Sequence, residues 1–175
     1  GSVKAIAQIK KRFPIVLLNP RFKVNGCVDI SIANFAGAHD VASHVLRQGH
    51  RRLAILKGPS GNVDAEERLR GYRKAFREVD ISPQDVLEVE GDFTEASGYH
   101  AASAVLRRTP AITAVLAAND YMAIGLLSAL EMAGLTVPED ISVTGFDDIA
   151  IARYLKPPLT TVHVPEGIDD MKLRQ

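Results

Sequence analysis

The sequence lacks the residue patterns that mark several protein classes. Its 175 residues contain no tryptophan and a single cysteine, Cys27, so an internal disulfide framework is excluded. Lys plus Arg and Asp plus Glu both total 21, which leaves no net positive charge to hold nucleic acid. No stretch approaches the roughly 20 apolar residues of a membrane-spanning helix, and the N-terminus has no signal-peptide pattern. These absences favour a cytoplasmic protein that contacts neither DNA nor a membrane through this chain.

Patterns of catalytic and cofactor-binding sites are also missing. The five histidines have neither H-x-x-x-H nor H-E-x-x-H spacing, so they form no metal-binding framework. The segment KGPSGN (57–62) has neither the G-x-G-x-x-G of a dinucleotide site nor the GK[ST] of a P-loop, and no G-x-S-x-G is present. The adjacent Asp147 and Asp148 point to opposite sides of an extended chain, unlike a glycosidase pair. We therefore expect no enzyme activity, no cofactor and no metal.

What the sequence does contain is a repeated alternation of short β-branched runs and amphipathic stretches of about 12 to 15 residues. The predicted strands are 15–18, 29–33, 53–56, 86–89, 112–117, 141–145 and 159–164. The predicted helices are 36–48, 64–79, 95–108 and 120–133. Strands that alternate with helices of this length predict an α/β fold with a doubly wound parallel sheet and right-handed crossovers.

Polar residues follow most of the predicted strands. In a doubly wound sheet the ligand crevice lies beyond the carboxyl ends of the strands, where helix N-termini also point. The residues expected on this rim are Asn34; Gly58, Pro59 and Ser60, which lead toward Arg68; Asp92 and Phe93; Asn119 and Asp120; and Asp147 and Asp148. A guanidinium, an aromatic face, amides and carboxylates together suit a polyhydroxylated ligand.

Each rim residue also has a purely structural interpretation. Asn119 and Asp120 can serve as helix N-caps, and Asp148 can cap the turn that follows it. Arg68 lies on a charged helix, where most arginines are solvated, and Phe93 at a strand end is more often a core residue. Position alone leaves these alternatives open, and the concentration of so many polar groups on one rim is the better evidence for a ligand site.

Five segments resemble the effector-binding domain of the LacI/GalR family of bacterial transcription regulators. They are GHRRLAILKGP (49–59), ERLRGYRKAF (67–76), VEGDFTEASGY (89–99), AANDYMAIGLLSALEMAGLTVPEDISVTGFDDI (117–149) and ARYLKPPLTTV (152–162). The match runs in unbroken order from about Ile6 to Val164, and the combination of AND, VPEDISVTGFDD and PPLTTV is highly specific. The resemblance implies a periplasmic-binding-protein-like fold of type I, with two lobes and the effector in the cleft between them.

The resemblance also implies effector-binding roles for six residues: Arg68, Phe93, Asn119, Asp147, Asn62 and Asp64. The arginine would bind polar groups of the effector, and the phenylalanine would stack on a sugar or a base. The Asn119 amide and the Asp147 carboxylate would hydrogen-bond to the effector. The remaining two residues lie on the variable loop before the arginine, where family members place effector-specific contacts. Asp148 is interpreted mainly as a cap.

The sequence departs from the family pattern at both ends. A regulator begins with a helix-turn-helix domain, a hinge and a first-lobe segment, whereas this chain opens at VKAIAQIKKRFPIVLLNP (3–20), which resembles only the last helix and strand of the first lobe. We therefore expect residues 1–19 to be a remnant of the first lobe, residues 20–163 to form the second lobe, and residues 164–175 to be a truncated crossover back to the first. Val164 also stands where the family commonly has glutamine after its histidine.

These features predict a ligand-sensing domain that binds a small polar effector, a sugar or a nucleobase-like molecule. The effector would control DNA binding by a domain absent from this chain, in a homodimer. The alternative is a transport-type periplasmic sugar-binding protein of the same fold, which would be exported; the VPEDISVTGFDD and PPLTTV segments favour the regulator. The apolar helix from Tyr121 to Ala133 also suggests an interaction module, although burial of that helix within the fold is preferred.

Overall fold

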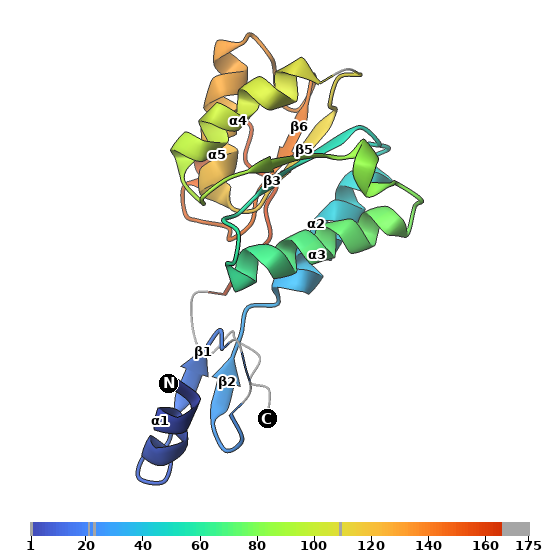
Figure 1. Cartoon of the computed structure of the whole chain (residues 1–175). Coiled ribbons are helices and arrows are strands. Elements are labelled where there is room, and N and C mark those ends of the chain that lie inside the picture. Colours follow the sequence, from blue (N-terminus) through green and yellow to red (C-terminus); the bar gives the residue numbers. More distant parts are fainter. Residues whose placement is uncertain (1, 21, 23, 109, 166–175) are drawn as a thin grey trace. The chain divides into compact units, whose positions relative to one another are not determined.

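The computed structural model describes residues 2–20, 22, 24–108 and 110–165, and its chain divides into two compact units (Figure 1). One unit comprises Gly1–Ala33 with Pro165–Gln175, and the other comprises Asn34–Val164. The larger unit begins at Asn34, whereas the second lobe was expected to begin at residue 20. Most of the expected crossover, residues 166–175, lies outside the described residues.

The smaller unit contains one helix and a two-stranded parallel sheet. Helix α1 (Ser2–Ile9) precedes strand β1 (Val16–Leu18), which pairs with strand β2 (Val28–Ile30). The predicted strands 15–18 and 29–33 correspond to β1 and β2. Because they pair with each other, both belong to this smaller unit. The backbone N–H of Asn19 extends the pairing by donating to the Ile30 carbonyl at 2.8 Å.

The larger unit is built on a four-stranded sheet in which all described neighbours are parallel. The strand order is β4-β3-β5-β6, so β3 and β5 are interior and β4 and β6 are edge strands. The strands are β3 (Leu53–Lys57), β4 (Leu87–Glu90), β5 (Ala114–Ala117) and β6 (Ser142–Thr144). All four residues of β5 are buried, as expected for an interior strand covered on both faces.

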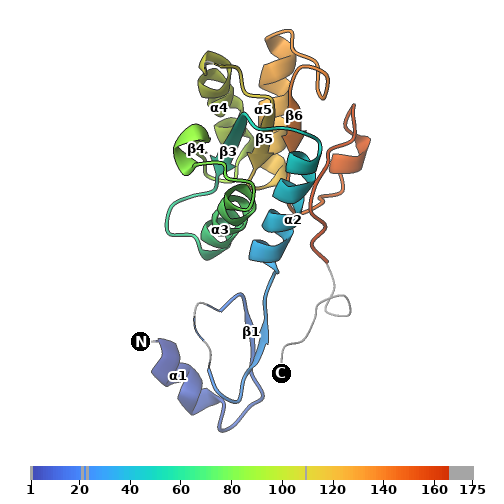
Figure 2. The same ribbon diagram turned by 90° about the vertical axis from the view of Figure 1, so that its right-hand side faces the viewer.

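Two pairs of helices cover the two faces of this sheet (Figures 1 and 2). Helix α2 (Asn34–Arg47) packs against α3 (Val63–Arg77) on one face, and α4 (Glu95–Arg107) packs against α5 (Asp120–Met132) on the other. Each of these helices begins and ends within two residues of its predicted bounds. The expected α/β fold with a doubly wound parallel sheet is therefore confirmed.

Helix α5 is largely a core helix. Met122, Leu126 and Leu130 are completely buried between the sheet and α4. The two helices approach so closely that a Cβ atom at Gly125 would lie 1.8 Å from the carbonyl oxygen of Glu95, so only glycine fits there. The preferred interpretation of this apolar segment, burial within the fold, is confirmed.

One predicted strand is wrong. Residues 159–164 form no continuous strand and instead meet the end of β6 at two isolated bridges, Thr144 with Thr160 and Asp147 with His163. Backbone hydrogen bonds from Gly145 to the Thr160 carbonyl and from Asp147 to the Val162 carbonyl accompany these bridges, and the chain turns at Asp147 and Asp148, whose φ angles are positive (112° and 55°). Two short 3₁₀ helices, Pro83–Asp85 and Ala152–Tyr154, were also not predicted. Within the described residues, no helix is long and apolar enough to cross a membrane.

Candidate functional site

Arg68 lies at the centre of a buried polar cluster at the carboxyl ends of the strands. Helix α3 positions it: Asn62 caps the helix by accepting a hydrogen bond from the Ala65 N–H at 3.0 Å, and Arg68 follows in the second turn. The residue is only 5% exposed. A buried guanidinium requires hydrogen-bonding partners because an unpaired charge away from water is strongly unfavourable.

Three groups from separate parts of the chain supply those partners. Arg68 Nε donates to Asn34 Oδ1 at 2.8 Å, and Nη1 donates to the Ala118 carbonyl at 2.5 Å. Its Nη2 forms an ion pair with Asp147 Oδ1 at 2.9 Å. Asn34 in turn donates through Nδ2 to Asp64 Oδ1 at 2.7 Å. Residues that are far apart in sequence are therefore joined through one side chain, which fixes the starts of α2 and α3 and the ends of β5 and β6.

Two aromatic rings flank the guanidinium. The Arg68 Cζ atom lies 3.8 Å from the ring centroid of Phe146 and 5.8 Å from that of Phe93, which are cation–π contacts. The Phe93 ring also packs over Gly58, where an added Cβ atom would lie 2.5 Å from two ring atoms. Phe93 is partly buried, packs against the hydrophobic core and has a φ of 70°. We call Arg68, Asn34, Asp64, Asp147, Phe93 and Phe146 the Arg68 cluster.

Asn119 is a helix cap that also holds the aromatic residue in place. Its Oδ1 accepts from the Met122 N–H at 3.0 Å, which caps α5, and its Nδ2 donates to the Phe93 carbonyl at 3.0 Å. The structural interpretation of Asn119 is therefore confirmed. Both Oδ1 and Nδ2 of the buried Asn119 side chain are therefore hydrogen-bonded within the larger unit, and the bond from Nδ2 holds the Phe93 backbone in place.

Asp120 and Asp148 behave differently from the caps that the sequence suggested. The fully buried Asp120 accepts from the Ile149 N–H at 2.9 Å through Oδ2 and from the Thr161 hydroxyl at 2.6 Å through Oδ1. It therefore ties the start of α5 to the chain after β6. Asp148 Oδ2 lies 2.8 Å from His163 Nδ1, so its carboxylate pairs with a side chain and the interpretation of Asp148 as a cap is wrong.

Burial and neighbouring charges act on these carboxyl groups in opposite directions. Desolvation raises the pKa of Asp147 above its usual value, and the nearby Arg68 partly opposes that rise. Desolvation likewise raises the pKa of Asp120, while the hydrogen bond from Thr161 opposes it. The charges of Asp120 and Asp64 add to the rise in the pKa of Asp147, because neighbouring negative charges disfavour its ionised form.

The structure brings together most of the six predicted site residues. Described contacts join Arg68 to Asp147 and Phe93, Phe93 to Asn119, and Arg68 through Asn34 to Asp64. The described side-chain contact of Asn62 is the cap of α3. Two cluster members, Asn34 and Phe146, were not among the six. The position of Asn34 after a predicted strand was a sequence signal that could have identified it. No sequence signal indicated that Phe146 would stack on the guanidinium.

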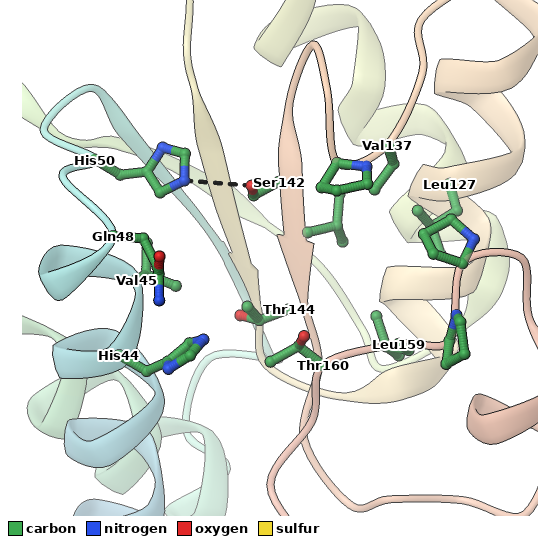
Figure 3. Close-up of a pocket in the computed structure, with 14 residues that line it drawn as sticks. His44, Val45, Gln48, His50, Leu127, Val137, Ser142, Thr144, Leu159 and Thr160 are labelled. Carbon is green, nitrogen blue, oxygen red and sulfur yellow. Dashed lines mark hydrogen bonds between the residues drawn. The ribbon is translucent and has the colours of Figure 1, made fainter.

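A separate cavity of about 430 Å³ lies beside β6 and the C-terminal end of α2 (Figure 3). Its lining contains no charged carboxylate, ammonium or guanidinium group and none of the Arg68 cluster. His50 lies at its edge, with Nδ1 3.0 Å from the Thr113 hydroxyl and Nε2 3.2 Å from the Ser142 hydroxyl. The buried hydroxyl of Thr144 has no hydrogen-bond partner among the described residues. Nothing in the sequence predicted this cavity.

The comparison with protein families covers most of the larger unit. Residues 42–166 match the family described as the periplasmic binding protein-like domain. The chain belongs to this family. The periplasmic-binding-protein-like fold that the sequence suggested is therefore confirmed, and the Arg68 cluster lies at the strand ends where open α/β sheets bind ligands.

Individual relatives are transcription regulators. Over 132 residues, this periplasmic-binding-protein-like chain is 40% identical to the HTH-type transcriptional repressor PurR of Salmonella paratyphi B, covering 75% of this chain and 39% of that protein. It resembles the structure of a LacI family transcriptional regulator from Enterococcus faecium with bound ribose: the TM-score is 0.84 and the identity 28%, over 94% of this chain and 61% of that one. A sugar-binding LacI family regulator from Escherichia coli complexed with phosphate gives a TM-score of 0.81 and 34% identity, over 94% and 60%.

These relatives confirm the resemblance to effector-binding domains of LacI/GalR regulators. They are transcription regulators, so the expectation that the chain is not an enzyme is confirmed, and the regulator is favoured over the transport-type alternative. The chain spans 39% of the length of the curated relatives that it matches.

Proposed function

We propose that the larger unit is the second lobe of the effector-binding domain of a LacI-type transcription regulator. It binds a small polar effector, a sugar or a nucleobase-like molecule, and this binding controls DNA binding by a domain outside the chain. The Arg68 cluster carries the proposal, because it combines a buried guanidinium, carboxylates and an aromatic face at the carboxyl ends of the strands. The ribose bound to the Enterococcus faecium regulator supports a sugar as one effector class.

The contacts of the cluster suggest how such a ligand is held. Asp147 Oδ1 is engaged by Arg68, and the side chain is 30% exposed, so its second oxygen can accept a hydrogen bond from a ligand hydroxyl. The Phe93 ring offers an apolar face to the C–H side of a sugar ring or to a base, and Asn119 holds the backbone that presents it. Asn62 and Asp64 are the proposed effector-specific contacts on the loop and first turn before Arg68.

Control of DNA binding would follow from linkage between two lobes. An effector that binds one closure state of the lobes better than another shifts the population toward that state by its difference in affinity. In this proposal the second lobe, represented by the larger unit Asn34–Val164, supplies one side of that cleft. Residues 1–19 belong to the first lobe, and residues 164–175 return to it. No bond in the effector is made or broken.

We also propose a cytoplasmic homodimer. Apolar side chains remain exposed on the outer helices of the larger unit: Tyr99 on α4 and Tyr121 and Met132 on α5 are 39%, 45% and 75% exposed. Exposed apolar groups on packed helices are suitable for contact with a second copy. Light scattering of the chain and of a Met132→Ser variant tests this proposal; a monomer mass for the unaltered chain at high concentration contradicts it.

Nuclear magnetic resonance titration tests effector binding directly. The ¹⁵N-labelled chain is titrated with monosaccharides and nucleobases at millimolar concentration, and the amide signals of Arg68, Phe93, Asn119 and Asp147 are followed. Saturable shifts confined to these residues and their neighbours support the proposal. An Asp147→Asn variant should weaken them, whereas Glu139→Gln, an exposed residue in the loop before β6, should not. A complete panel without saturable shifts contradicts effector binding by this lobe.

A further inference from the structure

The cavity beside α2 and β6 has the size of a ligand site and lies apart from the Arg68 cluster. Its volume of about 430 Å³ is within the range of small-molecule pockets, roughly 300–1,000 Å³. All of its lining residues belong to the larger unit, and none of them belongs to the Arg68 cluster. A molecule held in this cavity would therefore use different side chains from those proposed for effector binding.

One side of the cavity presents polar groups. Figure 3 shows that His44, Gln48 and His50 approach it from the end of α2 and the turn that follows. No hydrogen bond joins the side chain of His44 or Gln48 to another described residue, so both can bond to a ligand. His50 instead uses both ring nitrogens on the hydroxyls of Thr113 and Ser142. The Ser142 hydroxyl keeps hydrogen-bonding capacity in either tautomer of His50, since a hydroxyl has one donor and two acceptor positions.

Thr144 adds a buried hydroxyl to the floor of the cavity. The residue lines the cavity and is only 4% exposed, and its hydroxyl has no hydrogen-bond partner among the described residues. Buried polar groups in proteins are nearly always hydrogen-bonded, so this hydroxyl favours a polar group placed next to it. Rotation between staggered rotamers exchanges the hydroxyl and the methyl group of a threonine, which allows the side chain to turn its oxygen toward a ligand.

The opposite side of the cavity is apolar and carries no ionic group. Leu127, Val137 and Leu159 face the polar side in Figure 3, and three prolines complete the lining. The lining contains no carboxylate, ammonium or guanidinium group. Burial lowers the pKa of His50, which keeps its ring uncharged at neutral pH. An ionic ligand would therefore lose its water here without gaining a permanent opposite charge.

We propose that this cavity is a second small-molecule site, which takes an uncharged amphipathic molecule with an apolar body and hydrogen-bonding groups along one edge. The apolar body packs against Leu127 and Leu159, and the polar edge faces Gln48 and Ser142. The proposal goes beyond effector binding and does not depend on it, because the two sites have separate side chains. Failure of the sugar and nucleobase titration at the Arg68 cluster would leave it unaffected.

A matched pair of probes tests the site and its ligand class. The ¹⁵N-labelled chain is titrated with indole-3-carboxamide, which is uncharged, and with indole-3-carboxylate, which has nearly the same shape and one negative charge. We expect the carboxamide to give saturable shifts of the Val45, Ser142 and Thr144 amides at millimolar concentration. The carboxylate should bind at least about fivefold more weakly, because its charge loses water without compensation. The signals of Arg68 and Phe93 should not move.

Three results of this titration would overturn the proposal. Shifts that rise linearly without saturation would mean a hydrated cavity only. Saturable shifts at Arg68 and Phe93 in place of the cavity residues would put the probe at the effector cluster. Equal or tighter binding of the carboxylate would contradict the uncharged ligand class.

Substitutions at the end of α2 locate the bound probe. Gln48→Phe puts a bulky ring at an exposed position that lines the cavity and should abolish the saturable shifts. Arg47→Phe is the matched control, since this neighbouring residue is also exposed but does not line the cavity, and binding should be unchanged. Ser142→Ala should weaken binding severalfold, because it removes a hydroxyl from the polar side. Undiminished binding by Gln48→Phe would place the probe elsewhere and overturn the proposal.

Discussion

The guanidinium of Arg68 and the carboxylate of Asp147 form an ion pair in which Nη2 and Oδ1 are 2.9 Å apart. Arg68 belongs to helix α3 and Asp147 follows strand β6, so the ion pair links this helix to the carboxyl end of this strand. The arginine is buried, whereas the Asp147 side chain is 30% exposed. The contact thus joins a group that stabilises the fold to a group that solvent and ligand can reach.

Replacement of Asp147 by Asn should lower the free energy of unfolding by about 1–3 kcal/mol, because the buried guanidinium loses its charged partner. Urea unfolding measures this difference. Asp148→Asn alters the neighbouring carboxylate, which pairs with the exposed side chain of His163, and should change stability by less than about 0.5 kcal/mol. Effector binding by the full-length regulator, measured by calorimetry, should also fall more for the Asp147 variant. Equal or reversed losses would refute these roles.

Substitution Gly58→Ala should displace the Phe93 ring, since the added Cβ would lie 2.5 Å from two ring atoms and 2.8 Å from the Ala65 Cβ. Overpacking of this size costs about 1–3 kcal/mol of unfolding free energy. Effector affinity should decrease as well, because the aromatic face moves. Ser60→Ala changes an exposed residue on the same loop and serves as the control. Unchanged Phe93 ring and amide signals in Gly58→Ala would show that the ring does not pack there.

Stability should decrease as the pH falls below about 6.5, through the contribution of His50. Burial lowers the pKa of His50 from its ordinary value of 6.5, so the unfolded chain takes up a proton first. The contribution of His50 is therefore complete above its unfolded pKa and is lost progressively as the pH falls toward its lower folded pKa. His50→Gln should make urea midpoints less sensitive to pH between 5 and 8. His100→Gln, on the exposed side of α4, is the matched control and should retain the sensitivity.

Thr161→Val should loosen the chain that follows β6. The threonine hydroxyl donates to Asp120 Oδ1 at 2.6 Å and accepts from the Asp148 N–H at 3.3 Å, and valine preserves the shape but not these bonds. Removing a donor from a buried carboxylate costs about 1–3 kcal/mol. Amide exchange at Asp148 and Ile149 should also accelerate. Thr160→Val, at an exposed neighbouring position, should have little effect on either measurement, and equal effects of the two would contradict this role of Asp120.

Local patterns predicted the helices and most strands of the larger unit. The alternation of apolar runs and amphipathic stretches identified α2 to α5 closely, because both depend on periodicity within a short window. The segment 159–164 was predicted as a strand on composition, whereas it meets the end of β6 at two isolated bridges, and the geometry of contacts between segments distant in sequence is a tertiary feature that composition does not report.

The sequence predicted which residues belong to the site better than it predicted the contacts among them. Strand-end position and family resemblance singled out Arg68, Phe93, Asn119 and Asp147, which lie in contact or are linked through one another. Sequence spacing gave no reason to expect that Arg68 would be buried, since most arginines on charged helices are solvated. The partnership of Asp120 with Thr161 also joins residues that are distant in the chain, and no local pattern reports such a pairing.

The cap of helix α3 constrains how this protein can acquire a new effector preference. Asn62 and Asp64 precede Arg68 on the rim, so they are natural positions at which specificity can diverge without disturbing the buried ion pair. Yet the Asn62 side chain accepts the Ala65 N–H, and a residue without that oxygen would weaken the helix by about 1 kcal/mol. Position 64 can therefore vary only among residues that keep an acceptor for the Asn34 Nδ2 donor, whereas position 62 favours Asn, Asp, Ser, Thr and, at a small cost, Gly.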